Sequence, residues 1–239
     1  MGIGSTSIGL EGALEHLARL LPADAHELSV IRAQAPRTLL HPVNADLSEP
    51  SHGGHSMKIL VEGWAMRTKS LTDGRRQVIS VLIPGDIVSQ RQTAPGWGLT
   101  TVTAITPVRT LEAADLCNAL RQETGRPSWL ARACSAAAAS EDNLVLEHIV
   151  RLGLRDASER TAHLLLELRN RLDTVGLCSD DRFAFPLKQE LLGEALGMSV
   201  VHVNRTLQGL RKAGIFELHG GQVAVLQPEL AAKLAQIRI

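Results

Sequence analysis

Apolar residues near the start of the chain recur at the spacing of a helix. Leu10, Leu14 and Leu17 lie on one helical face, and Pro22 ends the pattern, so we predict a short amphipathic helix over residues 10–21. From about residue 28 to 111 the pattern changes to short β-type runs separated by turns. The clearest runs are residues 58–61, 64–70, 77–83 and 100–105.

The turns between these runs favour an all-β domain. Asp73-Gly74 lies between two alternating runs, which is a strong signal for a hairpin. Many short strands joined by glycine-containing turns predict a β-roll or jelly-roll-like domain. We place this domain in residues 1–126.

After Pro127 the apolar spacing becomes helical for about seven turns. Small and apolar residues form one stripe that only Glu141 interrupts, and such a thin stripe on a long helix is typical of packing on a second copy. Burial within a single chain is the alternative. We predict a dimerisation helix over residues 127–153, with the contact residues Leu130, Cys134, Ala137, Ala138, Val145, Ile149 and Leu152.

A helix-turn-helix pattern follows a further predicted helix over residues 156–172. Its two helices must approach closely, and Gly193 is the small residue in the middle of the first. Gly197 suits a turn that needs positive φ, and Ser199 suits the N-cap of the second helix. Ala213-Gly214 ends that helix.

Polar side chains occupy one face of the second predicted helix. Val203, Leu207 and Leu210 are spaced for the inner face, which leaves a face suited to base edges in a major groove. Two β-type runs, 215–218 and 222–226, then flank His219-Gly220-Gly221 and predict a β-hairpin wing. The outward residues are Val200, Val201, Asn204, Arg205 and Gln208.

Composition narrows the class of protein. The 239 residues carry 25 basic and 25 acidic side chains, which excludes a globally basic nucleic-acid coat protein and an acidic tail protein. The balance hides a small asymmetry, since residues 1–150 carry 13 basic and 15 acidic side chains and residues 151–239 carry 12 and 10. No apolar run is long enough to span a bilayer, and the start lacks the pattern of a secretion signal. The three widely spaced cysteines fit a reducing compartment, so we expect a cytoplasmic protein without membrane contact.

The order of a β domain, a long helix and a winged helix-turn-helix resembles the CRP/FNR family of bacterial transcription regulators. The segment LVEGWAMRTKSLTDGRRQVISVLIPGD (residues 60–86) is similar to the family's sensor β-roll, and FPLKQELLGEALGMSVVHVNRTLQGLRKAGI (185–215) is similar to its DNA-binding motif. The resemblance implies an α+β chain with a cyclic-nucleotide-binding-domain-like sensor and a DNA-binding domain over residues 154–239. It also implies a homodimer on a two-fold symmetric operator, with RNA polymerase as a partner if the protein is an activator.

Single residues carry the resemblance further. Arg205 matches the family's guanine-contacting arginine, and Gln189, Ser199 and His202 fall at positions of phosphate contacts. Val200 and Val201 fall where many members have polar base readers; valine cannot hydrogen-bond a base but can pack on a thymine methyl group. The operator is therefore expected to differ from the best-known family sites.

The sensor lacks the family's familiar ligand sets. Members that bind cyclic AMP hold it with a Gly-Glu pair and an Arg-Ser/Thr pair, whereas residues 88–100 contain one arginine and no glutamate. No cysteine precedes Cys117, so an iron–sulfur cluster is disfavoured along with cyclic AMP. We identify no cofactor and no metal site.

Three weaker candidates for a sensing role remain. His52 and His55, with His41 nearby in sequence, can be read as metal or haem ligands, although a solvated loop is the simpler interpretation. Trp97 can stack on a planar ligand or pack in the core. Cys178 is either an oxidation switch next to the helix-turn-helix or a plain surface thiol.

Three classes of function can be weighed on these residues. A dimeric DNA-binding regulator explains both the helix-turn-helix and the wing. A regulatory adaptor whose winged domain contacts only proteins is the alternative. An enzyme is not expected, because the histidines of residues 41–55 lack carboxylate partners and no nucleophile motif is present. The sensed signal, the operator sequence and the choice between activation and repression are not determined by the sequence.

Overall fold

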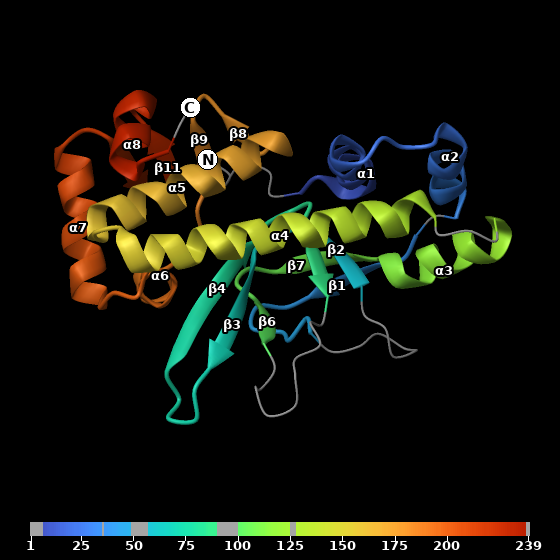
Figure 1. Cartoon of the computed structure of the whole chain (residues 1–239), viewed down its shortest axis with the longest axis horizontal. Helices are drawn as coiled ribbons and strands as arrows, with labels where there is room; N and C mark the ends of the chain where they lie inside the picture. The colour runs from blue at the N-terminus through green and yellow to red at the C-terminus, as the bar shows by residue number, and fades with distance from the viewer. Residues whose placement is uncertain (1–6, 35, 49–56, 90–99, 125–127, 238–239) are drawn as a thin grey trace. The chain divides into compact units, whose positions relative to one another are not determined.

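The computed structural model describes residues 7–34, 36–48, 57–89, 100–124 and 128–237 (Figure 1). The chain divides into two compact units. One comprises residues 7–69 and 81–143, and the other contains residues 70–80 and the chain from residue 144 onward.

Two helices form the described N-terminal segment. The predicted first helix is confirmed as α1 (Gly9–Leu20), which buries Leu14 and Leu17. A second helix, α2 (Ala25–Ala33), occupies residues where we expected β structure to begin, and that boundary was wrong. Asp24 explains the difference, because its carboxylate caps α2 by accepting hydrogen bonds from the amides of residues 26 and 27.

Two antiparallel sheets form the β-roll. One has the strand order β1-β7-β2-β5 and the other β4-β3-β6. The four predicted runs are confirmed as strands, and three short strands were missed. The bounds are β1 Thr38–His41, β2 Met57–Glu62, β3 Ala65–Ser70, β4 Arg76–Leu82, β5 Ile87–Ser89, β6 Thr101–Ala104 and β7 Val108–Glu112.

The predicted hairpin joins β3 and β4. Gly74 has φ +86°, and the Asp73 carboxylate accepts a hydrogen bond from the Arg75 amide at 3.0 Å. The Arg75 guanidinium also pairs with this carboxylate at 2.8 Å. The hydrogen bond from the Arg75 amide, and after it the bond from the guanidinium, lower the pKa of Asp73. The turn is therefore held by its own side chains.

Buried side chains of the β-roll form two clusters. One, which includes Leu60, Val102 and Val108, lies among the strands. The other packs α1, α3 (Ala113–Thr124) and the start of α4 (Trp129–Leu154) against the β1-β7-β2-β5 sheet, with Trp129 fully buried. The long helix predicted after Pro127 is confirmed as α4, the yellow-green helix of Figure 1.

The C-terminal part is a winged helix-turn-helix domain. It contains the predicted helices and wing together with a further hairpin, β8–β9, and a last helix, α8, which were not predicted. The sheet order is β10-β11-β9-β8. The bounds are α5 Ala157–Thr174, β8 Cys178–Ser179, β9 Arg182–Ala184, α6 Gln189–Leu196, α7 Val200–Lys212, β10 Phe216–His219, β11 Gln222–Val225 and α8 Pro228–Ala235. The predicted α+β class, with a β-roll, a long helix and a winged helix-turn-helix, is thus confirmed.

Candidate DNA-binding surface

The turn between α6 and α7 is built on two glycines. Gly197 ends α6 in the left-handed conformation, with φ +64° and ψ +39°, as the sequence predicted. Gly193 lies buried in the middle of α6, where the Met198 amide donates a hydrogen bond to its carbonyl oxygen at 3.0 Å. A Cβ atom at position 193 would lie 2.6 Å from the Met198 carbonyl oxygen. The close approach predicted for the two helices therefore depends on glycine at this position.

We expect Gly193→Ala to destabilise the chain by about 1–3 kcal/mol in urea unfolding, because the contact with the Met198 backbone outweighs the helix propensity of alanine. Gly209→Ala in α7 is the matched control, since a Cβ atom there meets nothing within 4 Å. That variant is expected to gain up to about 1 kcal/mol. Equal effects of the two substitutions would contradict the packing argument.

The second helix of the helix-turn-helix, α7, begins at a capped N-terminus. We call it the reading helix, because the sequence predicts that its outer face contacts base edges. The Ser199 hydroxyl accepts a hydrogen bond from the His202 amide at 3.3 Å, as expected for an N-cap. Val203 and Leu210 are buried as predicted, but Leu207 is only half-buried. Thr206 is buried instead and donates to the His202 carbonyl oxygen at 2.9 Å.

Side chains available to a ligand cover the opposite face of α7. Val200 and Val201 are 41% and 61% exposed, so an apolar pair starts the reading face. Within the part of the chain that the structure describes, the Arg205 guanidinium makes no hydrogen bond or ion pair. The exposed members of the predicted set are Ser199, Val200, Val201, His202, Arg205 and Gln208.

Two members of the predicted DNA-contacting set are joined to each other. Asn204 is half-buried, and its side-chain amide donates to the Gln189 Oε1 atom at 3.2 Å. Gln189 is the first residue of α6, so this bond links the start of α6 to the middle of the reading helix. Gln189 accepts through its oxygen in this bond, so the bond uses neither of its side-chain N–H groups.

A groove beside α7 adds residues that the sequence analysis did not assign to DNA binding. Its volume is about 240 Å³, and it is lined by Lys188, Leu207 and the wing residues His219 and Gln222, among others. Gly220 and Gly221 both have positive φ, which allows the tight turn of the wing. The predicted wing was the available signal for these residues, but its exposed polar side chains were not assigned a role.

The first half of α4 does not bear the predicted dimer contacts. Leu130 and Cys134 are buried in the core of their own chain, and Ala137 packs against the same cluster. The prediction for Leu130 and Cys134 was therefore wrong. Glu141, which interrupts the stripe, pairs through both carboxylate oxygens with the buried Arg67 of β3 at 2.9 and 3.2 Å. In this half of the helix the apolar stripe is the inward face.

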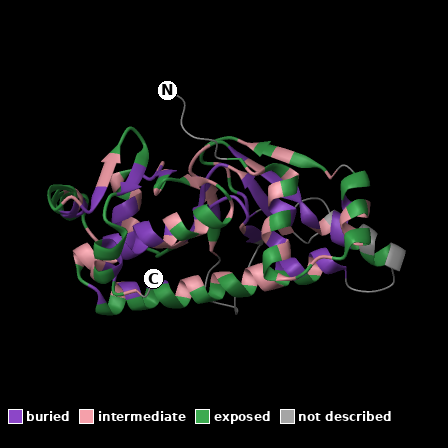
Figure 2. Ribbon diagram, turned by 90° about the horizontal axis from the view of Figure 1, so that it is seen from above, coloured by how far each residue is buried: buried purple, intermediate pink, exposed green. Residues whose placement is uncertain are grey.

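The second half of α4 exposes a different set of apolar side chains. Leu146, Ile149, Val150 and Leu154 are 60%, 60%, 39% and 83% exposed. Of the remaining predicted contacts, Ala138, Val145 and Leu152 are half-buried, and a Leu152 methyl group would lie 3.5 Å from a Cβ atom at position 197. Ile149 is thus the predicted contact residue that is most open to a second chain. Much of the long helix is exposed in Figure 2, where it lies at the bottom.

Most of the weaker sensing candidates gain no support. His41 Nε2 lies 2.9 Å from the Thr110 hydroxyl, and burial lowers the pKa of its imidazole. His52, His55 and Trp97 lie outside the described residues. Among the described residues, no group of three or more His, Cys, Asp or Glu side chains is arranged to hold a metal ion.

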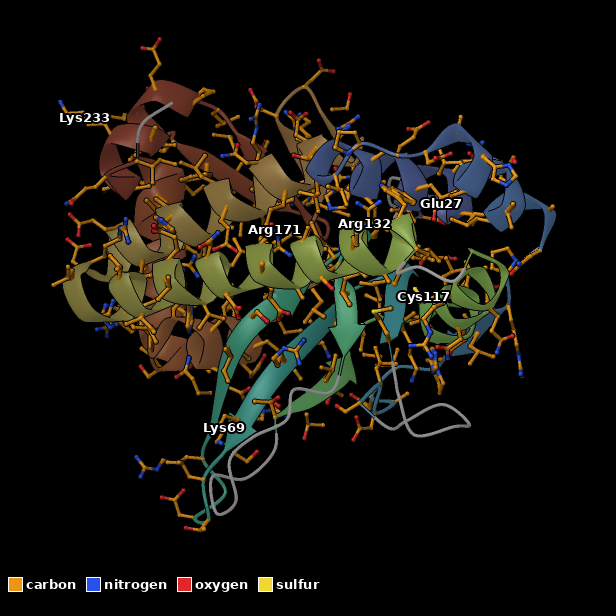
Figure 3. The ribbon with its side chains drawn as sticks, turned by 45° about the vertical axis from the view of Figure 1, so that its right-hand side comes forward. Glu27, Lys69, Cys117, Arg132, Arg171 and Lys233 are labelled. Atoms are coloured by element: carbon orange, nitrogen blue, oxygen red, sulfur yellow. The ribbon has the colours of Figure 1, made fainter. Side chains whose placement is uncertain are left out.

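The cysteines are thiols with raised pKa values. Burial raises the pKa of Cys117 on α3 to about 11 and that of Cys134 to about 12 (Cys117 is labelled in Figure 3). Burial also raises the pKa of Cys178, which starts β8. A thiolate is the reactive form, so these environments do not favour an oxidation switch.

Comparisons with known proteins match the architecture. Residues 159–233 match the model of the Crp-like helix-turn-helix domain. The nitrogen fixation regulation protein FixK of Bradyrhizobium diazoefficiens is 27% identical over 181 residues, which cover 74% of this chain and 72% of FixK. The transcriptional activatory protein AadR of Rhodopseudomonas palustris is 28% identical over 184 residues, 75% of this chain and 73% of AadR.

Solved structures share the fold. FixK2 from Bradyrhizobium japonicum superposes with a TM-score of 0.68 at 24% identity, covering 85% of this chain and 99% of FixK2. The CRP/FNR-family regulator TTHA1359 from Thermus thermophilus gives a TM-score of 0.59 at 16% identity, covering 85% of this chain and all of that one.

The fold and these matches define a protein with a β-roll domain followed by a winged helix-turn-helix domain of the Crp-like type. The chain is similar in sequence to the regulators FixK and AadR over about three quarters of its length, and residues 159–233 match the Crp-like helix-turn-helix domain. In the described residues, no helix is long and apolar enough to cross a membrane.

Proposed function

We propose that the chain binds a two-fold symmetric DNA operator as a homodimer, each copy placing α7 in a major groove. The observation that carries the proposal is the exposed face of α7, on which the Arg205 guanidinium is available for base contacts. Arginine binds guanine through two hydrogen bonds to O6 and N7, which gives discrimination between bases. Gln189, Ser199 and His202 are proposed to contact phosphates, and Asn204 to orient the Gln189 amide.

The exposed apolar residues of α4 support the proposed homodimer. Four large apolar side chains within nine residues are unusual on a surface helix, and a second copy of the helix would cover them. Two half-sites about one helical turn of DNA apart would then be read together. The excess of basic over acidic side chains after residue 150 is only two. We therefore propose that simultaneous binding of both half-sites by the dimer supplies DNA affinity that charge alone does not.

Replacing Arg205 is the direct test of base reading. A site is first selected from a degenerate duplex library with the wild-type chain. Arg205→Ala is then expected to lose about 1–3 kcal/mol on that site and to relax the preference at one base pair in each half-site. Binding is measured by fluorescence anisotropy at several salt concentrations.

Lys212→Ala provides the comparison, because Lys212 is exposed in the last turn of the same helix. It is expected to weaken binding to selected and random DNA alike. If Arg205→Ala also weakened both equally, Arg205 would contact only phosphate. Failure of the wild-type chain to select any symmetric site, with binding insensitive to salt, would reject the proposed function and favour a protein-binding adaptor.

We also propose a cytoplasmic location, RNA polymerase as a partner if the protein activates transcription, and a signal other than cyclic AMP or an iron–sulfur cluster. The absence of acidic residues between Asp86 and Glu112 supports the exclusion of cyclic AMP. The late position of Cys117 in the chain supports the exclusion of the cluster.

A further inference from the structure

A buried arginine lies at the corner where α4 meets the winged domain. α4 ends at Leu154 and α5 starts at Ala157, with Asp156 and Glu159 forming a capping box between them. Arg151, one turn before the end of α4, has a side chain that is only 2% exposed. Burying a guanidinium costs free energy unless its N–H groups donate hydrogen bonds to nearby acceptors.

Arg151 has partners on both helices. Its Nε atom donates to His163 Nδ1 on α5 at 3.1 Å, and one terminal nitrogen lies 3.3 Å from His148 Nδ1 on α4. The other terminal nitrogen pairs with the Glu167 carboxylate, also on α5. Glu167 also pairs at 3.2 Å with Arg171, one turn further along α5 (Arg171 is labelled in Figure 3). We call His148, Arg151, His163 and Glu167 the corner cluster.

The hydrogen bonds of the corner cluster require neutral imidazole rings. A guanidinium donates and never accepts, so His163 must offer an unprotonated Nδ1 lone pair. Both rings are nearly buried, at 8% exposure for His148 and 5% for His163. The arrangement is therefore directional, with the two ring nitrogens and one carboxylate defining the plane in which the guanidinium lies.

Two further arginines link the junction of α4 and α5 to other helices of the winged domain. Arg155 donates to the Ala235 carbonyl oxygen at the end of α8, at 3.1 Å. Arg160 donates to the Arg155 carbonyl oxygen at 2.7 Å and to the Leu196 carbonyl oxygen at the end of α6, at 3.2 Å. The ends of α6 and α8 are thus tied to the α4–α5 corner by charged hydrogen bonds.

The same turns of α4 carry the exposed apolar residues on their other side. His148 and Arg151 are three residues apart and buried, whereas Ile149, Val150 and Leu154 are exposed. The spacing of a helix separates these two sets onto different faces. A residue that fixes α5 on the inward face therefore also fixes where the winged domain lies relative to the exposed face.

We propose that Arg151 is a positioning residue. It orients the winged domain on α4 so that the two α7 helices of a homodimer fit DNA half-sites at one particular spacing. The inference rests on the proposed homodimer. Apolar residues can replace a buried ion pair without loss of stability, so a directional polar cluster at a corner is expected to contribute orientation. Arg151 itself is buried, so its side chain offers almost no surface for a direct contact with DNA.

The test compares the spacing preference of full-length variants. The probes are duplexes with the selected half-sites at their selected spacing, with one or two base pairs inserted or removed, and with one half-site alone. Wild-type chain is expected to prefer the selected spacing by at least about tenfold. Arg151→Met should reduce this preference to within about threefold, while its affinity for the single half-site stays within about twofold of wild type. Arg132→Met, an exposed arginine on α4, is the matched control and should change neither quantity (Arg132 is labelled in Figure 3).

Two milder variants cover a possible failure of Arg151→Met to fold. Glu167→Gln keeps an acceptor oxygen without the charge, and Arg151→Lys keeps the charge without the fork. Both should loosen the spacing preference, to a smaller extent. An unchanged preference in the folded variants, or an equal loss on the single half-site, would overturn the positioning role alone. A wild-type chain that is monomeric or indifferent to spacing would overturn the homodimer proposal and this inference with it.

Discussion

The double variant Leu146→Glu/Ile149→Glu is expected to sediment as a monomer under conditions where the wild-type chain is a dimer. Both side chains are 60% exposed in the single chain, so the substitution removes little internal packing. In a dimer each would bury an apolar surface that contributes about 1.5–3 kcal/mol. Four carboxylates would instead have to be desolvated against each other. We expect the dimer Kd to rise by at least about 1,000-fold, which corresponds to about 4 kcal/mol.

The control for this experiment is Leu40→Glu, which alters a side chain of similar exposure, 64%, on strand β1. It should leave the sedimentation coefficient unchanged. Leu152→Glu is a poor substitute, because Leu152 is half-buried and lies near the turn at Gly197. An unchanged dimer in the double variant would show that another surface joins the two chains. Monomers that keep the wild-type affinity for the symmetric site would contradict paired reading.

Acid is expected to destabilise the chain through the two imidazoles of the corner cluster. Burial lowers the pKa of His148 and His163 from the ordinary 6.5 to about 4, and the Arg151 guanidinium contributes to the lowering at both rings. Glu167 opposes the effect at both rings, Glu147 opposes it at His163, and Arg155 adds to it at His163. In the unfolded chain both rings recover their ordinary pKa values.

The sign of the pH effect follows from proton binding. Between about pH 6.5 and 4 the unfolded chain holds more protons on these histidines than the folded chain does, so the free energy of unfolding falls as the pH falls. The contribution is complete above pH 6.5 and amounts to at most about 3 kcal/mol for each ring. Urea unfolding at pH 7.5, 6, 5 and 4 measures it.

The variant His148→Gln/His163→Gln isolates this contribution. Glutamine keeps an acceptor oxygen for Arg151 but does not titrate, so the variant should lose less stability than wild type between pH 7.5 and 4. The difference between the two chains removes the effect of His41, whose pKa is also lowered by burial. Parallel pH profiles would show that His148 and His163 do not control the acid response.

Local sequence signals predicted the helix-turn-helix well, because single residues determine its geometry. A glycine that permits close approach, a glycine with positive φ and a serine cap occur within seven residues of each other, and the structure uses all three in the expected way. The missed elements had weaker local signals. Strands β1 and β5 have only four and three residues, too few to show an alternating pattern.

The assignment of faces on α4 failed for a physical reason. Periodicity shows that apolar residues share a stripe, but it does not show what covers that stripe. Leu130 and Cys134 are covered by the β-roll of the same chain, and Glu141 meets the buried Arg67 of β3. The exposed face lies elsewhere on the helix, so the tertiary structure moved the expected dimer contacts toward Leu146 and Ile149.

By itself, the amino-acid sequence determined the order of the domains, the helix-turn-helix with its wing and the polar face of the reading helix. These features depend on neighbours within one or two helical turns, which the sequence displays directly. Only the tertiary structure decided which side of α4 is open and which charges are buried with which partners. Arg151, His163 and Glu167 carry no motif, and their association depends on how α5 packs against α4. Long-range packing sets such contacts, and no local pattern records it.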